Sequence, residues 1–125
     1  MAKKELIQDL KFDAIYEDVL WALFEIEEPA VEPLIEALKD EDWNVRWGAV
    51  FSLGKMEITK AVDPLIKTLK DENEHVRSES IEALIEIGKP AVESLIKALK
   101  DESGLVQTLA KIALEKIKMK KLNIK

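Results

Sequence analysis

Apolar residues recur along the chain at the spacing of one helix face, and the same pattern appears three times. The stretch AVEPLIEALKDEDWNVR begins at Ala30, AVDPLIKTLKDENEHVR begins at Ala61, and AVESLIKALKDESGLVQ begins at Ala91. These starts lie 31 and then 30 residues apart, a period typical of stacked helical pairs. Because one pair cannot bury its own apolar face, the pattern predicts an all-α fold, an α-α superhelix of antiparallel helix pairs.

The period also predicts how the chain is divided. We expect residues 1–125 to form a single domain of about four helix pairs. The predicted parts are a degenerate first unit (1–28), three regular units (29–59, 60–88 and 89–120) and a frayed tail (121–125). In the regular units, the second helix is preceded by a residue type that favours a helix N-cap, namely Asp42, Asn73 or Ser103.

One face of each second helix carries the predicted core. Apolar or small residues recur there at i, i+4, i+8 and i+11, which places them on one side of a helix. We expect the following residues to be buried: Val45, Ala49, Leu53 and Met56; Val76, Ser80, Leu84 and Ile87; and Val106, Ala110, Leu114 and Ile117.

An aromatic stripe lies off this core face. Trp43, Trp47 and Phe51 are spaced by four residues, and Trp47 lies about 200° round the helix from Val45. Trp21 aligns with Phe51 one unit earlier, and the third unit has acidic residues in this region. An aromatic platform beside an acidic rim suits a basic, partly apolar peptide. The predicted partner-binding residues are Trp21, Trp43, Asn44, Trp47, Phe51, Glu79 and Glu82. Alternatively, the rings pack on one another and fill a tight groove.

The last predicted helix is apolar nearly all round. Leu105, Leu109 and Ile112 fall off the core face, and Leu109 and Ile112 align with Glu79 and Glu82. An amphipathic terminal helix would instead be polar on that side. One interpretation is a homodimer contact or partner-docking end. The other is that the terminal helix tilts inward and caps the stack with these residues.

Charge and composition exclude several function classes. The net charge is −6, but residues 110–125 carry +5, so residues 1–109 carry −11. Such an acidic body repels nucleic-acid phosphates and attracts basic peptides. The charged residues are mostly Lys and Glu, a balance typical of proteins from hot environments. No apolar run is long enough to span a membrane, and MAKKELIQDLKF lacks the apolar segment of a signal peptide, so we expect a cytoplasmic protein.

Candidate chemistry is sparse. The chain has no cysteine and one histidine, His75, so it offers neither a thiolate site nor a multi-histidine metal site. It also lacks a phosphate-binding Gly-rich loop. We therefore expect no catalytic residues, no metal and no cofactor.

The repeated pattern A-V-x-P-L-I-x-x-L-K-D-x-x-x-x-V-R resembles the short HEAT-like repeat of phycobilisome-lyase type, and it is similar to the consensus of artificial α-helical repeat scaffolds. The resemblance covers Pro29 to Ile117. It implies a right-handed superhelix, with first helices on the convex side and second helices on the concave side. It also implies a polar ladder between repeats, formed by Asp40, Asp71 and Asp101 with Arg46 and Arg77. Gln107 replaces the last arginine, so the ladder is expected to stop there.

These patterns lead to two function hypotheses. The first is a noncatalytic scaffold that holds a protein or peptide on the concave face of the second helices. The alternative is a subunit of a bilin-lyase-like or other modifying enzyme that is active only with a partner. Related hydroxylases bind iron through His-Glu pairs on several repeats, and the single His75 does not supply these. Related DNA glycosylases use a basic concave face, whereas this one is acidic.

The core register makes a prediction for stability. Replacing Leu84 with alanine should lower the free energy of unfolding by about 2–5 kcal/mol, because a buried leucine leaves a cavity. Chemical denaturation of both proteins measures this difference. An unchanged stability would show that Leu84 does not lie on the core face.

Overall fold

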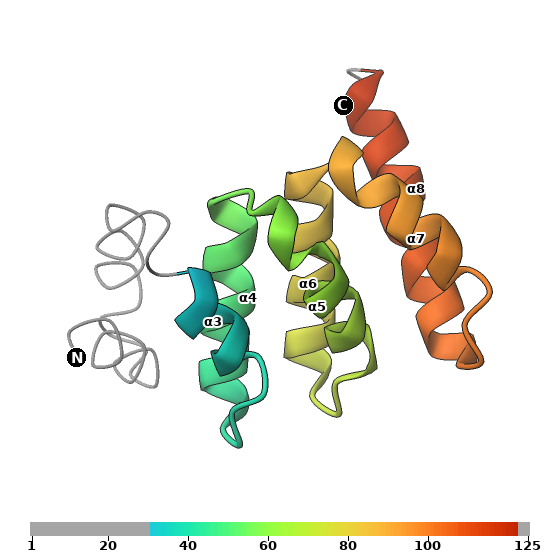
Figure 1. Ribbon diagram of the computed structural model, residues 1–125. Helices are drawn as coiled ribbons and strands as arrows, with labels where there is room; N and C mark the ends of the chain where they lie inside the picture. Colours follow the sequence, from blue (N-terminus) through green and yellow to red (C-terminus); the bar gives the residue numbers. More distant parts are fainter. Residues whose placement is uncertain (1–30, 123–125) are drawn as a thin grey trace.

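Helix pairs make up the part of the chain that the structure, a computed structural model, describes: residues 31–122. The first pair is α3 (Val31–Ala37) and α4 (Trp43–Lys55) (Figure 1). The second is α5 (Val62–Lys67), flanked by the 3₁₀ turns η4 (Thr59–Ala61) and η5 (Thr68–Lys70), with α6 (Glu74–Ile87). The third is α7 (Val92–Ala98), preceded by η6 (Lys89–Ala91), with α8 (Gly104–Lys121). The predicted unit 1–28 and Trp21 lie outside the described residues.

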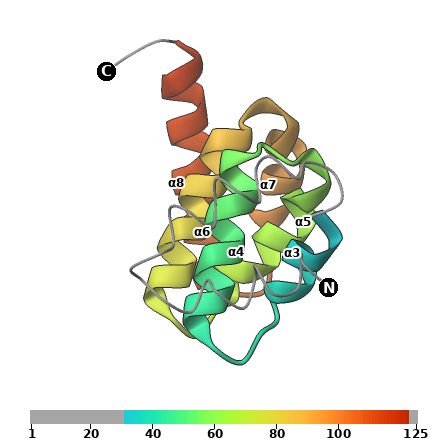
Figure 2. The same ribbon diagram turned by 90° about the vertical axis from the view of Figure 1, so that its left-hand side faces the viewer.

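The helices form two layers. Figure 2 shows the first helices, α3, α5 and α7, on one side and the second helices, α4, α6 and α8, on the other. The predicted all-α superhelix of stacked pairs is therefore confirmed. We call the side of α4, α6 and α8 that is turned away from the first helices the second-helix face.

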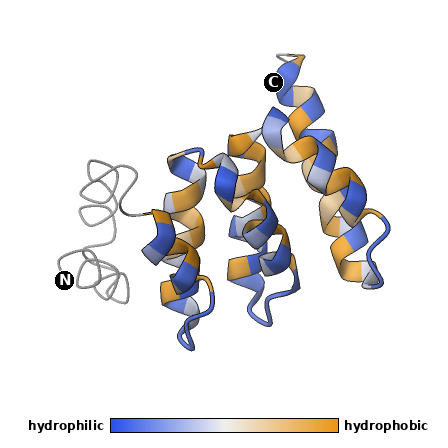
Figure 3. Cartoon of the chain, viewed as in Figure 1, coloured by the Kyte–Doolittle hydropathy of each residue, from blue (hydrophilic) through white to orange (hydrophobic). Residues whose placement is uncertain are grey.

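Each second helix begins at the capping residue that the sequence predicted. Asp42 accepts from the amide of Asn44 at 2.9 Å, Asn73 from that of His75 at 2.8 Å, and Ser103 from that of Val106 at 3.3 Å. These bonds satisfy amide groups that have no partner within the first helical turn. The turns that carry these caps are hydrophilic (Figure 3).

The core follows the predicted register with two exceptions. Ten of the twelve predicted core residues are buried, and Leu53 and Leu84 are both 0% exposed. Met56 is only half-buried because α4 ends at Lys55, and Met56 forms its C-cap. Leu114 is also only half-buried, and it lies in the last described pair, on which no further pair is stacked within residues 31–122.

Two buried hydroxyl groups in the second pair satisfy each other. Thr68 and Ser80 hydrogen-bond through their side chains, and Ser80 also donates to the carbonyl of Val76 at 2.8 Å. The equivalent positions are alanine in the first pair (Ala37 and Ala49) and in the third (Ala98 and Ala110), and all four are buried. The contact is thus polar on both sides or apolar on both sides, so no hydroxyl there is left without a partner.

Helices α4 and α6 of consecutive pairs approach each other closely at Gly54. A Cβ atom placed on Gly54 would lie 2.7 Å from both Cα and Cβ of Ala83. Glycine at position 54 and the small side chain of Ala83 therefore allow the backbones of α4 and α6 to come close together. The repeat alignment alone does not reveal this requirement, because Ile85 is the counterpart of Gly54 in the next unit.

Gly54→Ala should therefore destabilise the protein, although alanine favours helices more than glycine does. Overpacking against a neighbouring backbone costs about 1–3 kcal/mol. Gly104→Ala is the matched control, because a Cβ there meets nothing within 4 Å. We expect thermal unfolding to show a lower Tm for Gly54→Ala and an equal or higher Tm for Gly104→Ala. Equal effects at both positions would contradict the close approach.

Candidate functional site

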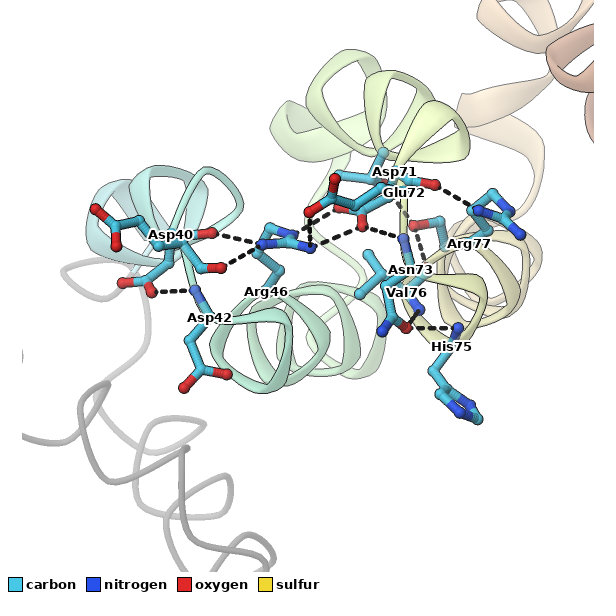
Figure 4. A network of polar contacts seen from close by, with 12 residues as sticks. Asp40, Asp42, Arg46, Asp71, Glu72, Asn73, His75, Val76 and Arg77 are labelled. Carbon is cyan, nitrogen blue, oxygen red and sulfur yellow. Dashed lines mark hydrogen bonds and ion pairs between the residues drawn. The ribbon is translucent and has the colours of Figure 1, made fainter.

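The turns of the first two pairs are joined by Arg46 (Figure 4). Its Nε and one terminal nitrogen donate to the two carboxylate oxygens of Asp71, at 2.7 and 2.9 Å. The other terminal nitrogen donates to the carbonyls of Asp40 and Glu41, at 2.7 and 3.1 Å. Arg46 is 8% exposed, and its hydrogen bond to Asp71 raises the pKa of its guanidinium. Such a bidentate, buried pair fixes the register of the two units.

The next rung of the expected ladder is not formed as predicted. Arg77 donates to the backbone carbonyl of Asp71 at 2.6 Å, and Asp101 is instead paired with Lys70 at 3.8 Å. Figure 1 shows that α7 and α8 are inclined to the preceding pair, so that the last turn lies apart from the others. Gln107 donates to the carbonyl of Asp101, the same bond within the turn that Arg77 makes. The interaction that all described units retain is therefore the one within each turn.

The aromatic stripe on α4 divides into two stacked contacts. The rings of Trp47 and Phe51 are stacked with centroids 5.2 Å apart, and both side chains are partly buried against the core. The ring of Trp43 is stacked on His75 of α6, with centroids 5.3 Å apart, and Trp43 is 37% exposed. The rings of the stripe are thus all in stacked contacts, and one indole still reaches the surface.

The remaining predicted site residues differ in their surroundings. Asn44 is half-buried at the start of α4, and its backbone amide is used by the Asp42 cap. Glu79 is half-buried, whereas Glu82 is exposed one turn further along α6. Trp21 aligns with Phe51 but is not among the described residues.

A lysine that the sequence prediction omitted completes this region. The ammonium of Lys55 lies 5.3 Å from the centroid of the Phe51 ring and 3.0 Å from Oε2 of Glu86. Lys55 follows Phe51 by four residues, so it extends the same stripe, and that spacing was the signal available in the sequence. The contact shows how this surface holds a cation between an aromatic ring and a carboxylate.

Glu79 is the most perturbed acid of the described residues. Burial, followed by the like charges of Glu82 and Glu86, raises the pKa of its carboxyl to about 7, while Lys55 acts in the opposite direction. A carboxylate that loses solvation and has carboxylates as neighbours gains from an added cation. The region around Phe51, Lys55, Glu79 and Glu86 is therefore suited to a second positive group.

The residues predicted for self-association do not share one environment. Leu109 packs against the core, as the inward-tilting interpretation requires. Leu105 and Ile112 are 45% and 36% exposed. The exposed residues lie on α8, the last helix of the described stack (Figure 1).

Two further classes of site are absent from residues 31–122. No group of three or more histidine or acidic side chains in this range could hold a metal ion. None of the helices in this range combines the length and apolarity needed to cross a bilayer.

Stacked helix pairs with joined turns define a tandem α-helical repeat protein, and sequence comparison gives the family. Residues 31–115 match the model of HEAT repeats, and residues 15–40 match that of the PBS lyase HEAT-like repeat. The chain belongs to the HEAT-repeat family. No curated protein sequence is significantly similar to it.

Solved structures show the same fold. Human deoxyhypusine hydroxylase, in complex with glycerol, is 23% identical with a TM-score of 0.69, over 99% of this chain and 45% of the hydroxylase. An engineered protein is 25% identical with a TM-score of 0.56, over 93% of this chain and 62% of that protein. The chain thus spans less than two thirds of either structure, and at this identity the hydroxylase shows a shared fold alone.

The raised pKa of Glu79 makes stability depend on pH. An unfolded glutamate has a pKa near 4.3, so the folded protein holds more protons between about pH 4.3 and 7, and its stability falls as the pH rises through that range. Glu79→Gln should increase the free energy of unfolding at pH 8 by about 1–2 kcal/mol and have little effect at pH 4.

Urea denaturation across this pH range measures the effect. Glu36→Gln, at an exposed position on α3, is the matched control and should leave the pH dependence unchanged. A Glu79→Gln curve parallel to that of the unmodified protein would contradict the perturbed carboxyl.

Proposed function

We propose that this HEAT-repeat protein is a noncatalytic scaffold that binds a protein or peptide on the second-helix face of α4 and α6. The observation that carries the proposal is the aromatic stripe on α4. It has an exposed indole, Trp43, and a half-buried stack of Trp47 and Phe51. Three acids of α6, Glu79, Glu82 and Glu86, lie on the neighbouring helix. Aromatic residues at a partly exposed surface are the usual energetic centres of protein interfaces.

The preferred ligand is a basic, partly apolar segment. Lys55 supports this choice, because its ammonium already uses the face of Phe51 and the carboxylate of Glu86. A lysine or arginine of a partner finds the same two groups, and Lys55 is exposed enough to move aside, with 52% of its side chain accessible. The added cation also relieves the repulsion among Glu79, Glu82 and Glu86. We place this function in the cytoplasm on the sequence grounds given above.

The alternative is a subunit of a bilin-lyase-like or other modifying enzyme. The observation in its favour is the match of residues 15–40 to the PBS lyase HEAT-like repeat. That match concerns one repeat unit and supplies no reacting group. The scaffold is preferred because the aromatic and acidic residues account for binding without a reaction.

Alanine substitution of the tryptophans tests the binding surface. Fluorescence anisotropy with a labelled peptide of alternating leucine and arginine should show affinity at least about tenfold weaker for Trp43→Ala and for Trp47→Ala. Leu99→Ala is the matched control, since Leu99 is as exposed (38%) as Trp43 (37%) but lies on the first-helix layer. It should bind the peptide as the unmodified protein does.

Circular dichroism separates lost binding from lost folding. Trp47 is half-buried, so its variant informs only if it remains helical, whereas the exposed Trp43 supplies an independent measurement. Equal affinity of Trp43→Ala and the unmodified protein would overturn the proposed surface. So would equal binding of a peptide with glutamate in place of arginine.

A further inference from the structure

The repeat alignment places three chemically different residues at one position of consecutive second helices. Phe51 of α4, Glu82 of α6 and Ile112 of α8 are related by the repeat offsets of 31 and 30 residues. Equivalent positions in stacked pairs lie on the same face, and on α8 the inclination of the last pair sets this position at an angle to that of α6 (Figure 1). The second-helix face therefore carries a different band on each helix. These are an aromatic band on α4 (Trp47 and Phe51), an acidic band on α6 (Glu79, Glu82 and Glu86) and an apolar band on α8.

The apolar band consists of three exposed residues on one side of α8. Leu105, Ile112 and Met119 follow one another at intervals of seven residues, which keeps them on one side of α8. Their exposed fractions are 45%, 36% and 48%. The equivalent of Leu105 in the preceding unit is His75 and that of Ile112 is Glu82, both of them exposed and polar or charged. Stacking of the repeat thus does not require apolar residues at these positions.

The side of α8 on which a further helix pair would stack has a different character. Val50 is fully buried at this position of the first pair, and its counterpart Ile81 packs against the core. In α8 the corresponding residue is the exposed Lys111, and Glu115 is likewise exposed where Ile85 packs against the core. Burying these charges under another helix pair would be costly. Lys111 and Glu115 therefore disfavour a further helix pair on that side of α8. The apolar band lies on a different side, the second-helix face, and is available there for binding.

We propose that the second-helix face binds a segment of a partner protein that has apolar residues at both ends and basic residues between them. The proposal rests on the proposed function and extends its site from two helices to three. One apolar end lies on Trp47 and Phe51, the basic centre lies opposite Glu79, Glu82 and Glu86, and the other apolar end lies on the apolar band. Charge complementarity orients the segment, because the centre is the acidic part of the face.

The spacing of the helices sets the length of this segment. Packed helices have axes about 8–10 Å apart, so the aromatic and apolar bands are separated by at least about 20 Å, since α8 is also inclined away from α6 (Figure 1). An extended segment covers this distance in about six residues and a helical one in about 13. A peptide of about 14 residues therefore reaches both bands in either conformation.

Labelled peptides of equal composition test the order of the bands. The first has leucines at both ends and arginines in the middle. The second has arginines at both ends and leucines in the middle, and the third has all leucines at one end and all arginines at the other. We expect the full chain to bind the first at least about tenfold more tightly than the second or third. Equal affinities would overturn the proposal while leaving the simpler site on α4 and α6 intact, and binding of none would overturn both.

Ile112→Glu tests the apolar band itself. The substitution copies the residue found at the equivalent position of the preceding unit, so the fold should tolerate it. The substitution should weaken binding of the first peptide at least about tenfold. It should also reduce the difference in affinity between the first and the third peptide. Ile96→Glu is the matched control, since it makes the same change at an exposed position of α7 (49%) in the first-helix layer. Its affinity should equal that of the unmodified protein.

Sedimentation of the unmodified chain and Ile112→Glu tests the competing occupant, a second copy of this chain. The proposal expects both to sediment as monomers without peptide. A dimer that Ile112→Glu dissociates, with unchanged peptide affinity, would assign the apolar band to self-association and overturn the proposal. So would equal losses of peptide affinity in Ile112→Glu and Ile96→Glu.

Discussion

Each helix pair within residues 31–122 buries apolar faces between its own two helices and against the neighbouring described pairs. Most of the stability therefore arises at contacts between neighbours, as expected for a repeat protein. The contact between α4 and α6 shows how narrow the tolerance is, because a single Cβ atom on Gly54 would lie 2.7 Å from the backbone of Ala83. The contact between α6 and α8 follows a different geometry, with the last pair inclined (Figure 1).

Polar groups add orientation to this apolar packing. Arg46 binds both carboxylate oxygens of Asp71 and two carbonyls of its own turn, so the turns of two units are held in one register. Thr68 and Ser80 satisfy each other in the interior. Among the described residues, Ser52 has a buried hydroxyl without a hydrogen-bond partner, and its counterparts Ala83 and Ala113 have no hydroxyl. Such an unpaired group usually costs about 1–3 kcal/mol.

Residues at the core positions of the repeat recur from unit to unit, whereas residues at the surface positions vary. This difference lets one repeat pattern carry a binding surface. Val45, Val76 and Val106 occupy the same core position in three units and are almost completely buried. Phe51, Glu82 and Ile112 occupy one repeat position and are aromatic, acidic and aliphatic, respectively. Because stacking places no demand on the surface position, its side chains are free to form the aromatic, acidic and apolar bands. Lys55 shows that this surface already binds one cation.

The sequence by itself determined the repeat, the helix pairs, the N-caps and nearly all of the core, because these depend on local spacing and on residue types that recur. It also placed Trp43, Trp47 and Phe51 on one side of α4. The tertiary structure decided which side chains meet. Trp43 stacks on His75, and the ammonium of Lys55 lies over the ring of Phe51. Arg77 does not pair with Asp101, and Glu79 is partly buried. These depend on the angle and separation between neighbouring pairs. Such geometry arises from how non-equivalent side chains such as Gly54 and Ile85 fit together, and a shared repeat pattern does not encode it.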